Sequence, residues 1–256
     1  MPYTGKVALV TGGGSGMGQL ACRNFAATGA QVAALDVNAE GLAKTAEGFE
    51  NIKTFHADIT DYDALVQTVN EVESTLGPID RVYNCAAIMP FGKVLELDVR
   101  AQQKTMDVNV NGLINIANAT VPQMLQRQKG DFVSFASMAG INPTLLTGSY
   151  SASKAAVDFY TQTLAHENRN SGVRFVSINP PLTNTPLLEQ GKNAWPKIID
   201  KGGAAIEPQQ VLDAIEKALD KGEIKAFVNR TERFGYLVAR LFPKQLWNYV
   251  HRVEGW

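Results

Sequence analysis

Short apolar segments alternate along this chain with longer segments in which apolar residues recur at the spacing of an amphipathic helix. The short segments predict strands at residues 6–10, 31–35, 53–57, 81–84, 132–135, 174–178 and 226–228. The longer segments predict helices at residues 19–28, 64–76, 101–121, 150–168 and 209–219, and Pro122 is expected to disturb the end of the third. Alternating strands and helices favour an α/β fold, a single-domain doubly wound parallel sheet with helices on both faces.

The composition supports one domain over residues 1–256. Of the 256 residues 45% are hydrophobic, and a domain of this size buries roughly three quarters of its unfolded surface. No linker, repeat or low-complexity run divides the chain. The net charge of −1 argues against a nucleic-acid partner.

Cysteines and histidines are few and scattered. Cys22 and Cys85 are expected to be reduced thiols, which favours a cytoplasmic protein. The three histidines show no metal-ligand spacing, so we expect no metal. We also expect no signal peptide, because a strand begins within a few residues of the N-terminus, and no apolar run long enough to span a bilayer.

The clearest candidates for chemistry are Tyr150 and Lys154. In a helix, residues four apart lie on one face, one turn from each other. An ammonium beside a phenol favours the phenolate, so we expect the pKa of Tyr150 to fall from about 10 toward working pH. A tyrosine tuned in this way passes a proton to or from an alcohol oxygen. With a dinucleotide to carry the hydride, the pair predicts an oxidoreductase of alcohols and carbonyls.

A glycine-rich loop at residues 11–18 lies between the first predicted strand and the first predicted helix. Gly12, Gly16 and Gly18 permit a tight turn and the close approach of a pyrophosphate, which the helix N-terminus attracts. Asp36 follows at the end of the second strand, where a carboxylate accepts hydrogen bonds from ribose hydroxyls and repels a 2′-phosphate. Because the loop has no basic side chain, we expect a Rossmann-like site that prefers NAD to NADP.

These motifs, in this order, resemble those of the short-chain dehydrogenase/reductase family, in its single-domain branch, over residues 5–186. The matching segments are residues 11–18, 58–59, 84–87, 109–112 and 179–185, together with Ser137, Tyr150 and Lys154. The chain departs from the family pattern at two glycine positions, which hold Ala87 and Pro181. The proline fixes φ and removes a donor where the family's loop approaches the nicotinamide.

The resemblance implies roles for four catalytic residues. Tyr150 would be the general acid in reduction and the general base in oxidation, and Lys154 would lower its pKa and bind the nicotinamide ribose. Ser137 would hold the substrate oxygen, and Asn109 would hold a water that links Lys154 to solvent. The cofactor-binding residues expected on the same basis are Gly12, Ser15, Gly16, Met17, Gly18, Asp36, Asp58, Ile59, Asn84, Ala86, Tyr150, Lys154, Pro180, Thr183 and Thr185.

The apolar residues around these motifs predict a hydrophobic secondary alcohol or ketone as substrate. Candidate substrate contacts are Met89, Met138, Leu145, Leu188 and Trp195, and residues 187–206 are expected to form a lid. Residues 233–256 contain two amphipathic pieces, divided by Pro243, in which aromatic and basic residues alternate. We expect this tail to pack on another subunit of a homodimer or homotetramer, in preference to capping the pocket or lying on a membrane surface.

Two other functions stay open. One is an NADPH-dependent 3-oxoacyl-thioester reductase of the same family, against which Asp36 argues. The other is a catalytically silent nucleotide-binding or scaffold protein. The presence of Ser137, Tyr150 and Lys154 together argues against it.

Overall fold

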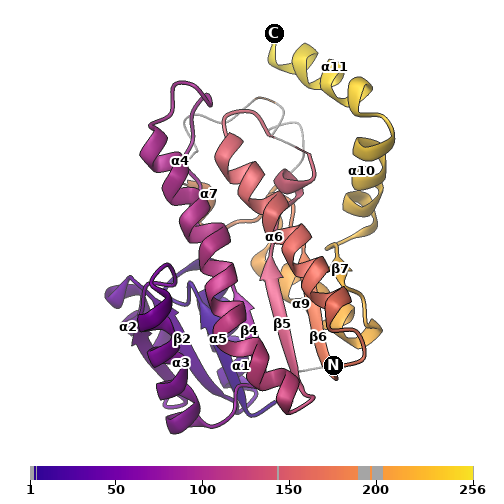
Figure 1. Cartoon of the computed structure of the whole chain (residues 1–256). Helices are drawn as coiled ribbons and strands as arrows, with labels where there is room; N and C mark the ends of the chain where they lie inside the picture. Colours follow the sequence, from indigo (N-terminus) through magenta and orange to yellow (C-terminus); the bar gives the residue numbers. More distant parts are fainter. Residues whose placement is uncertain (1–2, 4, 143, 190–196, 198–203, 256) are drawn as a thin grey trace.

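A parallel sheet of seven strands forms the centre of the protein, in a computed structural model that describes residues 3, 5–142, 144–189, 197 and 204–255. The strands are β1 (Val7–Thr11), β2 (Gln31–Asp36), β3 (Ile52–His56), β4 (Arg81–Asn84), β5 (Gly130–Phe135), β6 (Val173–Ile178) and β7 (Lys225–Ala226). Their order across the sheet is β3-β2-β1-β4-β5-β6-β7 (Figure 1). The order reverses between β1 and β4, which confirms the doubly wound sheet and marks the edge where ligands bind in such folds.

Helices cover both faces of the sheet. Within the described part of the chain they are α1 (Gly16–Ala27), α2 (Ala39–Ala46), α3 (Tyr62–Leu76), α4 (Val99–Met106), α5 (Gly112–Gln126), α6 (Gly148–Glu167), α7 (Pro186–Glu189), α9 (Pro208–Lys221), α10 (Arg230–Leu241) and α11 (Pro243–Glu254). Helices α1 and α9 pack together on one face, whereas α3, α5 and α6 cover the other.

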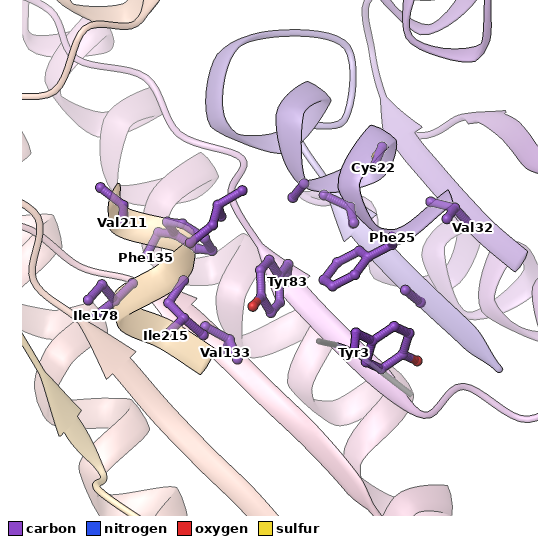
Figure 2. Close-up of a cluster of buried hydrophobic side chains, with 14 of the residues drawn as sticks. Tyr3, Cys22, Phe25, Val32, Tyr83, Val133, Phe135, Ile178, Val211 and Ile215 are labelled. Carbon is purple, nitrogen blue, oxygen red and sulfur yellow. The ribbon is translucent and has the colours of Figure 1, made fainter. Parts of the chain in front are cut away.

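The strands separate two hydrophobic cores. In β1, Ala8 and Val10 face the core with α1 and α9, whereas Leu9 faces the core with α3 and α5. Figure 2 shows the first core, in which Phe25 of α1 meets Tyr83 of β4 edge-on with ring centroids 4.9 Å apart. Each fully buried side chain of this size stabilises the fold by roughly 1.5–3 kcal/mol relative to exposure. Because both faces of the sheet are covered, β1 is buried over its whole length and β2 over most of it.

The structure corrects four details of the predicted elements. Helix α2 was not predicted, although Asn38 caps it by accepting a hydrogen bond from the N–H of Gly41. The helix predicted over residues 101–121 is interrupted by a π-helical turn, Asp107–Asn111, and then continues through Pro122 to Gln126. The prediction that Pro122 disturbs its end is wrong, because the helix continues beyond the proline to Gln126. Strand β7 covers residues 225–226, whereas the sequence predicts a strand at residues 226–228.

The C-terminal tail forms two helices, α10 and α11, along one side of the protein beyond β7 (Figure 1). Pro243 begins α11, as its place between the two amphipathic pieces predicts. None of the described residues of either helix is buried. Of the predicted lid at residues 187–206, the structure describes the end of α7, residue 197 and residues 204–206.

Candidate active site

A cavity of about 880 Å³ opens at the carboxyl edge of the sheet, where the strand order reverses. The glycine loop and the end of β2 line one side, and the ends of β4 and β5, helix α6 and the segment after β6 line the other. All the cofactor-binding residues expected from the sequence line this cavity, except Asn84. The site therefore combines the dinucleotide motif and the Tyr-Lys motif in one space.

The glycine loop offers a cradle of bare backbone. Gly12 adopts a left-handed φ of 67°, and a Cβ there would lie 2.8 Å from the backbone of Ala86. A Cβ on Gly18 would lie 2.1 Å from the carbonyl oxygen of Gly12. Ser15, at the N-cap of α1, makes no side-chain bond to the first turn, which leaves the N–H groups of that turn available to an anion. These features fit the pyrophosphate of a dinucleotide.

Asp36 stands at the cavity wall after β2, and its carboxylate is held in place by two backbone groups. Its Oδ2 accepts a hydrogen bond from the N–H of Gly14 at 2.9 Å, and its Oδ1 accepts one from the N–H of Asn38 at 2.9 Å. The carboxylate therefore has a second role, which is to join the glycine loop to the start of α2. Its lone pairs not used by these bonds can accept hydrogen bonds from a ribose.

Asn84 lies behind the cavity wall and is buried. Its Oδ1 accepts a hydrogen bond from Oγ1 of Thr11 at 2.8 Å, and the same Oγ1 accepts one from the N–H of Ala86 at 3.3 Å. The structure thus places Asn84 as a support of the strand ends that form the wall.

Tyr150 and Lys154 lie one turn apart on α6, and both are buried at the cavity. The Nζ of Lys154 is 5.7 Å from the centroid of the Tyr150 ring and donates a hydrogen bond to the carbonyl oxygen of Phe135 at 2.6 Å. Burial raises the pKa of Tyr150 to about 12, and a hydrogen bond with Ser137 acts in the opposite direction. Burial also lowers the pKa of Lys154 to about 8.

The prediction that the lysine lowers the pKa of Tyr150 is wrong for this arrangement of side chains. The ammonium bonds to a backbone carbonyl, not to the phenol, and desolvation of the phenolate is the larger effect on the tyrosine. At neutral pH the phenol is therefore protonated, which is the form that a general acid requires.

Ser137 follows β5 and caps a short 3₁₀ turn, Met138–Gly140. Its Oγ accepts a hydrogen bond from the N–H of Ala139 at 3.1 Å. The turn carries Met138 into the cavity wall. Ser137 and Tyr150 both line the cavity, so the serine hydroxyl and the phenol lie in the same space.

Asn109 sits in the π-helical turn and is buried away from the cavity. Its Oδ1 accepts from the N–H of Ile88 at 2.9 Å, and its Nδ2 donates to the carbonyl oxygen of Ile88 at 3.0 Å and to Oγ of Ser153 at 2.9 Å. The Ser153 hydroxyl in turn donates to the carbonyl oxygen of Tyr150 at 2.7 Å. Asn109 thus joins the segment after β4 to α6, and its predicted water-binding role stays a prediction.

The substrate side of the cavity is partly as predicted. Met89, Met138 and Leu188 line it, whereas Leu145 is not among the lining residues and Trp195 lies outside the described part of the chain. Polar groups that the sequence did not single out also line the cavity, and they include Lys104, Asn142, Thr144, Thr147, Thr231 and Glu232. The Oδ1 of Asn142 is buried and has no hydrogen-bond partner among the described groups.

Comparison with known proteins gives the family. Residues 6–195 match the family model described as short chain dehydrogenase. The chain belongs to this family. It is 32% identical to an uncharacterised oxidoreductase of Staphylococcus saprophyticus over 84% of this chain and 92% of that protein. It is 33% identical to meso-2,3-butanediol dehydrogenase of Serratia marcescens over 82% of this chain and 86% of that protein.

A solved short-chain dehydrogenase from Streptomyces avermitilis shares the fold, with a TM-score of 0.82 over 97% of this chain and 98% of that one at 23% identity. Members of the short-chain dehydrogenase family are oxidoreductases that act on CH–OH or carbonyl groups with nicotinamide cofactors, so this chemistry is the general activity of the chain. Among the described residues, Cys22 and Cys85 are free thiols, and no three metal-binding side chains gather. None of the described helices is long and apolar enough to cross a bilayer.

Proposed function

We propose that this protein transfers a hydride between NAD(H) and a hydrophobic secondary alcohol or ketone. The observation that carries the proposal is the position of Tyr150, buried in one cavity with the glycine loop and an apolar wall that includes Met89 and Met138. A bound nicotinamide would supply or accept the hydride; every proton step falls to the side chains of this chain.

In reduction, Tyr150 donates its phenolic proton to the developing alkoxide while the Ser137 hydroxyl holds the same oxygen. The high pKa of Tyr150 suits this direction, because the proton is in place before the reaction begins. In oxidation the phenolate must form first. Lys154 favours it once its Nζ turns from the carbonyl oxygen of Phe135 toward the cavity, because an ammonium at closer range stabilises the phenolate.

The preference for NAD rests on Asp36 and its surroundings. The carboxylate lies at the cavity wall with Val37 beside it, and the glycine loop contributes no basic group there. A 2′-phosphate at this position would face the negative charge of Asp36, and neither Val37 nor the glycine loop supplies a cation to offset it, whereas the ribose hydroxyls of NAD can donate to the carboxylate.

The substrate is proposed to be largely apolar with at least one hydroxyl or carbonyl group. The cavity walls near Tyr150 include the side chains of Met89, Phe91, Met138 and Leu187. Asn142 lines the cavity and its Oδ1 has no partner among the groups that the structure describes, which favours a substrate with a second group that can donate a hydrogen bond. The likeness to a butanediol dehydrogenase supports the inclusion of small diols among the candidates.

The experiment is to follow absorbance at 340 nm with NAD and NADP in parallel against small diols, aliphatic secondary alcohols and aryl carbinols. The reductive assay uses NADH and NADPH with the matching ketones and a 3-oxoacyl thioester. Turnover with NAD and secondary alcohols is expected. Turnover confined to NADPH and the thioester would replace the proposal with the reductase alternative, and cofactor binding without turnover on any substrate would indicate a silent protein.

A further inference from the structure

We propose that α10 and α11 form a docking arm, residues 230–254, through which this protein binds the surface of an anionic lipid bilayer. The arm lies beside the cavity, so binding would place the cavity close to the lipid. The proposal concerns the surface of the protein and does not depend on which cofactor the cavity holds.

Charge is unevenly divided between the docking arm and the rest of the chain. The arm holds five of the 24 Arg and Lys residues and two of the 25 Asp and Glu residues. It therefore has a net charge of +3, and the remaining residues have a net charge of −4. An anionic surface would attract the arm and repel the remainder, which orients the protein on the bilayer.

The docking arm also presents apolar side chains to solvent. Phe234, Leu237 and Leu241 recur at positions i, i+3 and i+7 of α10, so they form one stripe, and Phe234 and Leu241 are 67% and 68% exposed. Phe242, directly before α11, and Tyr249, within α11, are also exposed. Helices that lie in a bilayer interface present such a stripe of aromatic and leucine side chains.

Basic side chains border the exposed stripe directly. Arg233 and Arg240 lie four residues before and three residues after Leu237, so both are its neighbours on the helix surface, and both are exposed. Interfacial membrane helices place Lys and Arg at the edge of the apolar face in this way. Because the docking arm has a net charge of +3, contact with a second, identical arm would be repulsive, which favours an anionic lipid surface.

The base of the docking arm is fixed to the catalytic helix. Tyr236 of α10 packs on the Nζ of Lys225, which is 4.5 Å from its ring centroid. The same Nζ contacts Oδ2 of the buried Asp158, on α6, at 2.5 Å. Oδ1 of Asp158 accepts a hydrogen bond from Oγ of Ser177 at 2.6 Å, so the contact continues to the end of β6. The arm therefore has a defined direction relative to the active site.

The arm borders the cavity, and its far end lies at the same end of the protein as the cavity. Thr231, Glu232 and Gly235, in the first two turns of α10, line the cavity. Figure 1 shows α11 and the segment between β4 and α4 at the end of the protein toward which β5 points. That segment contains Leu95, which is 99% exposed. If the proposed function holds, an apolar substrate would pass from the bilayer into the cavity along this end.

The test is co-sedimentation of the full-length protein with vesicles of phosphatidylcholine alone and of phosphatidylcholine mixed with phosphatidylglycerol, at low and high salt. We expect binding to the anionic vesicles only, weakened by salt. Arg233→Gln and Lys244→Gln should each weaken partitioning about fivefold, since one basic residue near an anionic surface contributes about 1 kcal/mol. Phe234→Ser and Leu241→Ser should weaken it further.

Matched controls use exposed residues outside the docking arm. Lys217→Gln with Lys221→Gln on α9 removes the same charge as the two basic arm variants together. Phe159→Ser on α6 removes a side chain that is 65% exposed, close to that of Phe234. Both controls should retain vesicle binding.

Three results would overturn the proposal. They are equal binding to neutral and anionic vesicles, no binding to either, and equal losses in the control and arm variants. A change of oligomeric mass in the arm variants without vesicle binding, measured by light scattering, would assign the arm to a second copy of the chain. Turnover of a water-soluble alcohol, measured in every variant, separates failure of the docking proposal from failure of the proposed function.

Discussion

The Nζ of Lys154 donates a hydrogen bond to the carbonyl oxygen of Phe135 at 2.6 Å. The contact joins the catalytic helix α6 to the last residue of β5, two positions before Ser137. It holds the lysine in a buried place beside the ring of Tyr150, where the ammonium loses its hydration. The charged form of Lys154 therefore destabilises the folded protein, and the pH dependence of unfolding measures this effect.

The free energy of unfolding should depend on pH because Lys154 is buried. The folded-state pKa is lowered to about 8, below the value of about 10.4 expected for an unfolded chain. Between these values the unfolded chain binds a proton that the folded protein does not, so this group makes stability rise with pH in that window. Lys154→Met should remove about 2 kcal/mol of that rise between pH 8 and pH 10.

The measurement is urea unfolding of the wild type and of Lys154→Met at several pH values. The difference between the two proteins reports the lysine together with its charge interaction with Cys85, because the buried Cys22 thiol, whose pKa is raised by burial, is common to both proteins. A difference that does not vary with pH would show that Lys154 keeps an ordinary pKa.

We expect Ser153 to position Tyr150 and not to contribute to the binding of NADH. Its buried hydroxyl links Nδ2 of Asn109 to the carbonyl oxygen of Tyr150. Ser153→Ala leaves Nδ2 of Asn109 with one partner fewer, and we expect a loss of about 1–3 kcal/mol in the free energy of unfolding with a lower kcat. Dissociation constants for NADH should stay close to the wild type, and Ser153→Thr should restore part of the kcat. A tenfold change in NADH affinity would assign Ser153 to the cofactor site instead.

Gly18 should tolerate no side chain. A Cβ at this position would lie 2.1 Å from the carbonyl oxygen of Gly12, so Gly18→Ala must displace the backbone of the cradle. We expect a stability loss of about 1–3 kcal/mol from overpacking and a loss of NADH affinity of roughly tenfold or more. Gly235→Ala is the control, since its Cβ would meet no atom closer than 4.0 Å. Fluorescence titration with NADH distinguishes the two, and equal affinity in both variants would contradict the assignment of the cradle.

Asp36 should control the choice between NAD and NADP through its charge. Asp36→Asn keeps an oxygen that can accept from the N–H of Gly14 or of Asn38 but removes the negative charge. We expect the ratio of kcat/KM for NAD to that for NADP to fall roughly 10- to 100-fold, and further when Val37→Arg is added. Asp63→Asn, an exposed carboxylate on α3, is the control. An unchanged ratio would mean that another group selects the cofactor.

Much of the fold follows from the local sequence. The short apolar segments are predicted correctly as strands because the sheet is covered on both faces. Pro243 begins α11 and the glycine loop precedes α1, as expected. Helix α2 was missed because it has only eight residues, and its start depends on a single capping residue, Asn38. The π-helical turn at Asp107–Asn111 could not be predicted, since it depends on contacts of Asn109 with Ile88 and Ser153.

Those residues of the site that belong to short sequence motifs could be predicted. The Tyr150–Lys154 spacing and the glycine loop place their members in one cavity. The pKa of Tyr150 could not be predicted, because it depends on how the fold buries the phenol and on where Lys154 finds its partner. The cavity contacts of Thr231 and Glu232 were not predicted either. They arise from the direction of α10 relative to β5, which no local pattern records.

The central claim is that Tyr150 is the acid and base of the reaction, and one variant tests it directly. Tyr150→Phe removes only the hydroxyl from a buried ring, so the fold and the NADH site should stay intact. We predict that turnover followed at 340 nm falls by roughly 10²–10⁴-fold while the dissociation constant for NADH stays within about twofold of the wild type. Turnover within tenfold of the wild type, with NADH binding retained, would contradict the account and transfer the proton step to another group.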